Sequence, residues 1–140
     1  MTSRVLIVSP RPILREALSR WAEETGDLEV VDELTRGEEA LVSATHSPPD
    51  LVVLEADIPG MNGFETAGAL SRDIPDLGII IIAESGGPDL RKRAADVGAK
   101  GFVSKTWGRE AFRDVVRLVR EGGSPVLVEV YQDTPGPPSR

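Results

Sequence analysis

The sequence predicts an α/β domain, in which one doubly wound sheet of five parallel strands carries helices on both faces. Four short, unbroken apolar runs stand at 5–8, 51–54, 79–82 and 101–103. Short runs of this kind, bounded by Gly, Pro or Asp, are typical of strands that are buried on both faces. The segments between them repeat apolar residues with a helical period, so that strand and helix alternate along the chain. Such alternation requires parallel strands joined by right-handed crossovers.

The first predicted helix follows the strand at 5–8, and a weaker strand follows that helix. Segment 28–31 alternates apolar and acidic residues, which favours a strand at the edge of the sheet. The apolar stripe of the first helix is expected to face the core. Its members are Ile13, Leu14, Ala17, Leu18 and Trp21.

The later helices carry recognisable ends. Thr35 and Glu38 fit a capping box that opens a helix extending to about His46. Asn62 opens a further helix, and Gly98 closes the helix before the last strand. The final helix has an apolar stripe opposite a basic one. The apolar stripe contains Phe112, Val115, Val116 and Val119, and the basic one Arg113, Arg117 and Arg120.

Length, charge and composition exclude several classes of function. A chain of 140 residues accommodates one domain, which we expect at 3–123, followed by a partly disordered C-terminal arm or tail at 124–140. Within that arm, 125–131 reads as one more strand or as an extended arm. The net charge of −7 speaks against a protein that covers nucleic-acid phosphates. The absence of cysteine excludes disulfides and zinc–thiolate sites. Without a signal peptide or a membrane-length apolar run, we expect a soluble, cytoplasmic protein.

Ligand sites of doubly wound sheets lie beyond the carboxyl ends of the strands. The candidate site is therefore built from the residues that follow the first, third, fourth and fifth predicted strands. In chain order these are Ser9, Pro10, Glu55, Asp57, Ala83 and Lys105.

Two of these segments carry a family resemblance. Segment 49–63, PDLVVLEADIPGMNG, resembles the phosphoacceptor segment of bacterial response-regulator receiver domains. Segment 98–105, GAKGFVSK, resembles their fifth strand and its lysine. The likeness extends over about 3–123, and Thr106 after the lysine is typical of the LuxR-type subfamily. The resemblance implies a flavodoxin-like fold with strand order 2-1-3-4-5.

The resemblance also implies a chemistry, against which this chain departs at several positions. In the family, two acids and an aspartate hold a magnesium ion while the aspartate attacks a phosphoryl group, and a hydroxyl residue and a lysine bind that group. Here Ser9 and Pro10 replace the acids, and Glu55 replaces the aspartate. Ala83 replaces the hydroxyl residue, and Lys105 alone is retained. We therefore expect a degenerate phosphoacceptor site without catalytic residues or cofactor, and with weak or absent magnesium binding.

Several residues of this site admit two interpretations. Glu55 either forms a standing ion pair with Lys105 that imitates the phosphorylated charge pattern, or it is a solvated acid of a dead site. Asp57 is a possible substitute acceptor, although its position in the family supplies only a backbone carbonyl to the metal. Phe102 stands where the family has its switch aromatic, and it either switches or is simply packed. Trp107 either caps the core, which we favour, or anchors a partner.

The function predicted is that of an atypical receiver in signal transduction or transcription regulation. It would act through protein contacts without phosphorylation, would not be an enzyme, and would form a homodimer as well as contacting a protein of its pathway. We expect no membrane contact, and no direct nucleic-acid contact within these 140 residues. The alternatives are the N-terminal receiver of a longer LuxR-type DNA-binding regulator, and a phosphorylatable receiver that uses Glu55 or Asp57. A flavin-binding protein of similar topology is disfavoured, because two prolines in 9–12 remove amide donors from its phosphate loop.

Overall fold

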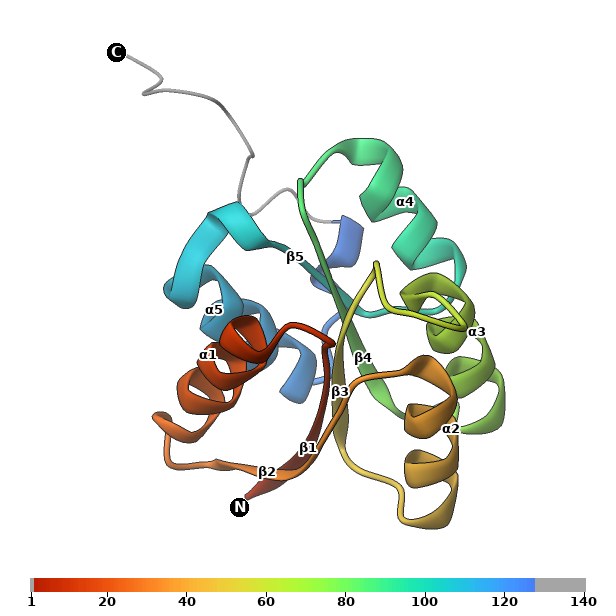
Figure 1. The fold of residues 1–140 in the computed structure, drawn as a ribbon. Coiled ribbons are helices and arrows are strands. Elements are labelled where there is room, and N and C mark those ends of the chain that lie inside the picture. Colours follow the sequence, from red (N-terminus) through yellow and green to blue (C-terminus); the bar gives the residue numbers. More distant parts are fainter. Residues whose placement is uncertain (1, 128–140) are drawn as a thin grey trace.

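Strands and helices alternate along residues 2–127, which are the residues that the computed structural model describes (Figure 1). The strands are β1 (Ser3–Val8), β2 (Leu28–Leu34), β3 (Leu51–Glu55), β4 (Gly78–Ala83) and β5 (Gly101–Ser104). The helices are α1 (Pro12–Glu23), α2 (Gly37–His46), α3 (Gly63–Asp73), α4 (Pro88–Asp96) and α5 (Gly108–Arg120). Two short 3-10 turns, η1 (Lys105–Trp107) and η2 (Pro125–Leu127), flank α5.

The five strands form one parallel sheet in the order β2-β1-β3-β4-β5, which confirms the predicted topology. Strand β2 lies at an edge, as its alternating pattern predicts, and it is longer than the predicted segment 28–31. Because all strands run the same way, the carboxyl ends of β1, β3, β4 and β5 meet along one rim of the sheet. This rim carries the predicted site residues.

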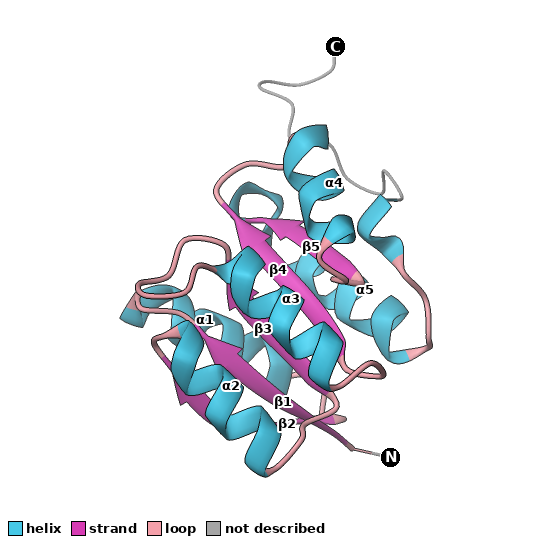
Figure 2. Cartoon of the chain, turned by 90° about the vertical axis from the view of Figure 1, so that its right-hand side faces the viewer, coloured by secondary structure: helices cyan, strands magenta, loops and turns pink. Residues whose placement is uncertain are grey.

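Both faces of the sheet are covered, so successive residues of the central strands enter two different cores. Helices α1 and α5 lie on one face, and α2, α3 and α4 lie on the other (Figures 1 and 2). In β4, Ile80 and Ile82 pack with α1 and α5, whereas Ile79 and Ile81 pack on the opposite side. A strand alternates its side chains between faces, and an apolar core on each face accounts for the unbroken apolar runs. No helix within residues 2–127 has both the length and the apolar character needed to cross a bilayer.

The predicted apolar stripe of α1 is wrong at one position. Ile13 is 84% exposed, whereas Leu18 is buried. At about 100° per residue, Ile13 lies about 140° around the helix axis from Leu18 and points to solvent. The inward face instead combines Leu14, Leu18, Trp21 and Ala22. The predicted helical period is correct. The buried face is rotated around the helix axis relative to the predicted stripe, so that it includes Ala22 and leaves out Ile13.

The predicted start of α2 is displaced by one residue. The helix begins at Gly37, and Glu39 rather than Glu38 closes the capping interaction, because its Oε1 accepts from the backbone N–H of Arg36 at 3.1 Å. Glu38 reaches instead to the loop before α3, where its Oε2 accepts from Met61 N at 2.9 Å. The other predicted ends are confirmed: Asn62 caps α3, and Gly98 follows α4 with a φ of 95°.

After α5 the chain returns to the sheet instead of forming a further strand over the described part of 125–131. Residues 125–127 form the turn η2, and the backbone N–H of Val126 donates to Lys100 O at 3.0 Å. Val126 is buried in the core that lies between the sheet and the helices α3 and α4. Contacts with the sheet and its core therefore continue to Val126, while 128–131 lie outside the described residues.

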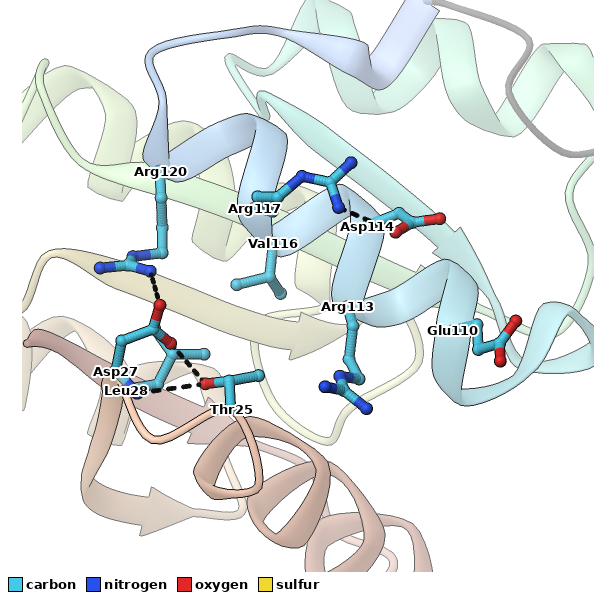
Figure 3. A pocket seen from close by; sticks show the side chains of 9 residues that line it. All are labelled: Thr25, Asp27, Leu28, Glu110, Arg113, Asp114, Val116, Arg117 and Arg120. Carbon is cyan, nitrogen blue, oxygen red and sulfur yellow. Dashed lines mark hydrogen bonds and ion pairs between the residues drawn. The ribbon is translucent and has the colours of Figure 1, made fainter.

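A polar clamp holds the end of α5 against the turn between α1 and β2 (Figure 3). Arg120 Nη1 contacts Asp27 Oδ2 at 2.7 Å, and Arg120 Nε donates to Ser3 Oγ at 2.9 Å. Thr25 Oγ1 donates to Asp27 Oδ1 at 2.5 Å. The Thr25 hydrogen bond and the Arg120 guanidinium together lower the pKa of the Asp27 carboxyl.

This clamp predicts a pH-dependent contribution to stability. Because the pKa of Asp27 is lowered by folding, its stabilisation is present at neutral pH and is lost as the pH falls through the range where the carboxylate is protonated. We expect Asp27→Asn to cost about 0.5–1 kcal/mol at pH 7, since solvent screens this half-exposed pair, and less at about pH 3. Thermal unfolding of both proteins at the two pH values measures the difference. Asp96→Asn, at an exposed ion pair with Lys92, is the matched control; an Asp27 effect that is equal at both pH values contradicts the prediction.

Candidate functional site

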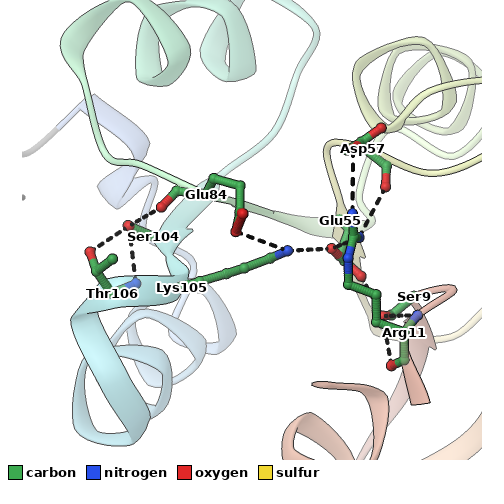
Figure 4. Close-up of polar contacts among 8 residues, drawn as sticks. All are labelled: Ser9, Arg11, Glu55, Asp57, Glu84, Ser104, Lys105 and Thr106. Atoms are coloured by element: carbon green, nitrogen blue, oxygen red, sulfur yellow. Dashed lines mark hydrogen bonds and ion pairs between the residues drawn. The ribbon is translucent and has the colours of Figure 1, made fainter. Parts of the chain in front are cut away.

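The candidate site lies on the rim where β1, β3 and β5 end (Figure 4). Ser9 follows β1 directly, and its backbone N–H donates to Leu34 O at 2.8 Å, which extends the ladder to β2 by one residue. Glu55 is the last residue of β3, and Lys105 is the first residue after β5. The parallel strands of one sheet therefore bring these three side chains to the same rim from positions far apart in the sequence, β1 and β3 as neighbours and β5 across β4.

The carboxylate of Glu55 is the centre of the site. Its side chain is 1% exposed, yet both of its oxygen atoms have partners. The Ser9 hydroxyl donates to Oε1. Oε2 contacts Arg11 Nη1 at 2.5 Å and Lys105 Nζ at 2.7 Å. A buried carboxylate is tolerated only when it is paired and hydrogen-bonded, and this one is enclosed by one hydroxyl and two cations.

Lys105 is placed by the local structure after β5. Ser104 is buried, and its Oγ accepts from Thr106 N at 3.2 Å, which caps the turn η1 that begins at Lys105. The lysine side chain, 18% exposed, then crosses the rim to Glu55 and also contacts Glu84 Oε1 at 3.3 Å. The structure thus contains the Glu55–Lys105 ion pair that the sequence suggested, and Glu55 is not a solvated acid.

Arg11 is the site residue that sequence reasoning missed. It precedes α1 and directs its guanidinium toward the loop after β3. Besides Glu55, it contacts the Asp57 carbonyl oxygen and Asp57 Oδ2, each at 3.4 Å. The signal was present, since Arg11 belongs to the loop that follows the first strand and so lies at the same rim as Glu55. Glu84 was missed as well, although it is adjacent to Ala83.

The remaining predicted residues contribute less to this cluster. Asp57 is 86% exposed, and its carboxylate faces Arg11 rather than the buried centre. Pro10 is half-buried and carries no polar side-chain atom, while Ala83 is 5% exposed and offers only a methyl group. The structure brings Ser9, Glu55 and Lys105 into contact, with Asp57 joined to them through Arg11.

Two aromatic side chains pack beside the site. Phe102 is 3% exposed and meets Trp107 edge-on, with ring centroids 6.0 Å apart. The indole of Trp107 lies so close to Gly86 that a Cβ atom at that glycine would stand 2.5 Å from Cζ2 of the indole. Trp107 therefore packs against Phe102 and the backbone of Gly86 and caps the core there. This agrees with the interpretation that the sequence favoured.

The residues present do not fit a magnesium ion. Mg²⁺ holds its water tightly and takes carboxylate and carbonyl oxygens in octahedral geometry. Here the Ser9 hydroxyl donates a hydrogen bond to Glu55, and the Glu55 carboxylate faces two cations. Within residues 2–127 no group of three or more acidic or histidine side chains is gathered in a way that could hold a metal ion.

Known proteins resemble this chain along most of its length. A model of the response regulator receiver domain matches residues 5–117. The response regulator GacA of Pseudomonas viridiflava is 28% identical over 92% of this chain and 60% of its own length. The transcriptional activator protein ExaE of Pseudomonas putida is 33% identical over 84% of this chain and 55% of its own length. The chain thus spans less than two thirds of the length of these curated relatives.

A solved structure agrees with the sequence matches. The two-component response regulator of the LuxR family from Aurantimonas sp. SI85-9A1 is 26% identical, with a TM-score of 0.85 over 92% of this chain and 94% of that one. The fold, the family model and the relatives point the same way. The chain therefore belongs to the response regulator receiver domain family of two-component signalling, and LuxR-type response regulators are among its relatives.

Proposed function

We propose that this receiver domain signals through protein contacts without being phosphorylated. The observation that carries the proposal is the enclosed carboxylate of Glu55, whose oxygens are held by Ser9, Arg11 and Lys105. A carboxylate in this state is not available as a nucleophile, because its lone pairs face a hydroxyl proton and two cations. The domain is then a binding module of the cytoplasm rather than an enzyme.

The same ion pair supports a fixed conformation. In a phosphorylated receiver, the lysine after the fifth strand would face a negative phosphoryl group. Here Lys105 faces the longer side chain of Glu55, which supplies a permanent negative charge at 2.7 Å. Phe102 is buried and in contact with Trp107, so the aromatic next to the site packs inward in this structure. These contacts favour constitutive mimicry of the phosphorylated charge pattern.

The partner proposed for the domain is a second copy of itself, joined through α1 and α5. The outer surface of α1 carries exposed acids, Glu16 and Glu23 among them. The adjacent α5 lines a groove with Arg113 and Arg117 (Figure 3). In a two-fold dimer each patch meets the other copy in the reverse direction, so the acids on the outer surface of α1, which lie beside Arg20, would face the basic residues of α5 in the partner. The charge complementarity of these two neighbouring helices supports this arrangement over contacts made elsewhere.

A second candidate function is that of the receiver part of a longer DNA-binding regulator. It is favoured by the curated relatives, which are longer than the region that they share with this chain and include a transcriptional activator. A helix-turn-helix segment encoded in frame after residue 140 would support this candidate. Under it, the protein contacts proposed here would set the spacing of the attached DNA-binding parts.

The first prediction concerns phosphorylation. Incubation with a small phosphodonor and millimolar magnesium should leave the intact mass unchanged, because the enclosed Glu55 has no magnesium site beside it and Ala83 offers no hydroxyl to a phosphoryl group. Intact-mass spectrometry measures this, with a phosphorylatable receiver as positive control. A stoichiometric phosphate adduct that maps to Glu55 or Asp57 would instead support the phosphorylatable alternative.

The second prediction concerns the coupling between Glu55 and Lys105. Glu55→Gln and Lys105→Met should each destabilise the domain by about 1–3 kcal/mol, since each removes a charge-assisted contact from a largely buried place and leaves Glu55 only Arg11, or Lys105 only Glu84, as its counter-ion. The double variant should be no less stable than the worse single one, because the interaction can be lost only once.

Chemical denaturation of the four proteins gives the coupling energy. The exposed pair Lys92–Asp96, which is typically worth about 0.3–0.5 kcal/mol, supplies the control cycle. Strictly additive effects of the two site substitutions would mean that the charges act independently, and constitutive mimicry would then fail.

The third prediction concerns self-association. Sedimentation at increasing concentration should reveal a dimer that weakens as salt rises, since exposed charges are screened beyond about 10 Å at 0.1 M salt. Arg113→Glu together with Arg117→Glu should abolish it, whereas Lys92→Glu on α4 should leave it intact. A monomer at every concentration would remove the dimer from the proposal without affecting the fold.

A further inference from the structure

The side chain of Arg11 connects the loops after β1 and β3, because it contacts several oxygen atoms at once. The guanidinium of Arg11 reaches Glu55 Oε2 at 2.5 Å, the carbonyl oxygen of Asp57 at 3.4 Å and Asp57 Oδ2 at 3.4 Å (Figure 4). Two carboxylates and one backbone carbonyl are the oxygen donors that a hard cation takes in a protein. In this chain the guanidinium of Arg11, a cation that is part of the polypeptide, contacts these oxygen atoms.

We propose that Arg11 is the resident cation of this site and excludes divalent metal ions from it. The inference deepens the proposed function, since it concerns the same carboxylate. It assigns to Arg11 the charge neutralisation and loop positioning that a bound metal ion supplies elsewhere. Arg11 is a positioning residue in this role, and it acts through Glu55 and the β3–α3 loop.

The backbone of Arg11 is fixed in a way that suits this role. Its N–H donates to Ser9 Oγ at 3.2 Å, and Pro12 directly after it begins α1. The neighbouring Arg15 is occupied elsewhere, with Nη1 on Ser9 O at 2.8 Å and Nε 3.6 Å from Glu33 Oε1. Of these two arginines, Arg11 is therefore the one directed to Glu55.

The chemistry of the guanidinium explains why it can do this without a metal. It is planar, permanently charged and carries five N–H donors, so it can contact a carboxylate and a carbonyl together. It is also weakly hydrated, whereas magnesium gives up its water reluctantly. A divalent ion among the same oxygens would meet the positive charges of Arg11 and Lys105 at contact distance. The negative charge of the site is therefore neutralised by Arg11 and Lys105, and metal ions are excluded from it.

The test compares the response to magnesium in paired variants. Arg11→Ala removes the cation, and Arg109→Ala is the control, because Arg109 is similarly exposed and also contacts one acid, Glu24, at 3.7 Å. Ser9→Asp, alone and combined with Arg11→Ala, adds a carboxylate beside Glu55 and so strengthens any metal site that opens. Thermal unfolding is recorded with rising MgCl₂ against NaCl of equal ionic strength.

The wild type, Arg109→Ala and Ser9→Asp should show no stabilisation specific to magnesium. Arg11→Ala should gain stability with magnesium, and Ser9→Asp/Arg11→Ala should gain more. A concentration ten times the dissociation constant raises the folding equilibrium constant about eleven-fold. Arg11→Lys, which keeps a positive charge, should be as insensitive as the wild type. A second readout gives the location: Mn²⁺ should broaden the amide signals of residues 9, 11 and 55–57 in the Arg11→Ala proteins only.

A magnesium response that is equal with and without Arg11 would overturn the inference, as would broadening by Mn²⁺ at those residues in the wild type. If the Arg11→Ala proteins fold only with magnesium, that dependence supports it. The proposed function is tested separately, by phosphodonor labelling of the wild type. Labelling of the wild type would defeat that proposal whatever Arg11 does, and a metal-silent Arg11→Ala protein would leave it intact.

Discussion

Much of this domain's site depends on the cost of burying one negative charge. Glu55 ends a strand that is covered on both faces, and its side chain is almost completely enclosed. A carboxylate in such a place has to be met by donors and opposite charge, and two loops supply them: Ser9 and Arg11 follow β1, and Lys105 follows β5. The contacts tie together strands that are distant in sequence, so the rim of the sheet is held by the same charges that define its chemistry.

The sheet makes this arrangement possible because two apolar cores, rather than the site's polar residues, fill the space on its faces. Apolar side chains alternate between two cores, and the strand order follows from parallel crossovers. The site loops lie beyond the last buried layer, where a substitution changes chemistry without changing the topology. The receiver fold is therefore formed with Ser9 and Pro10 after β1, neither of which offers a carboxylate at this rim.

The fold was largely predictable from sequence, and the site only in part. Unbroken apolar runs such as 79–82 determine the strands strongly, because a strand buried on both faces has few alternatives. Ile13 was misassigned because an apolar side chain in the first turn of a helix fits the period but not the position of the core. The ion pair of Glu55 with Lys105 was one of two interpretations that the sequence left open, because strand order places both residues on one rim but does not decide whether their charges meet. The contact with Arg11 was not predicted, because the direction of a long side chain leaving a loop depends on which neighbour it can neutralise. Likewise, Glu38 and Glu39 could be told apart only once the loop at Met61 was in place.

Because the negative charge at this position belongs to the side chain of Glu55, it cannot be added and removed, and this affects how such a domain is controlled in time. A phosphoryl group on an aspartate is added and hydrolysed, so the signal it carries has a lifetime. The negative charge of Glu55 is part of the polypeptide and lasts as long as the molecule does. Under the proposed function, the strength of the signal is then set by mass action, through the rates of synthesis and degradation that fix the protein's concentration, and the response is as slow as the turnover of the protein itself.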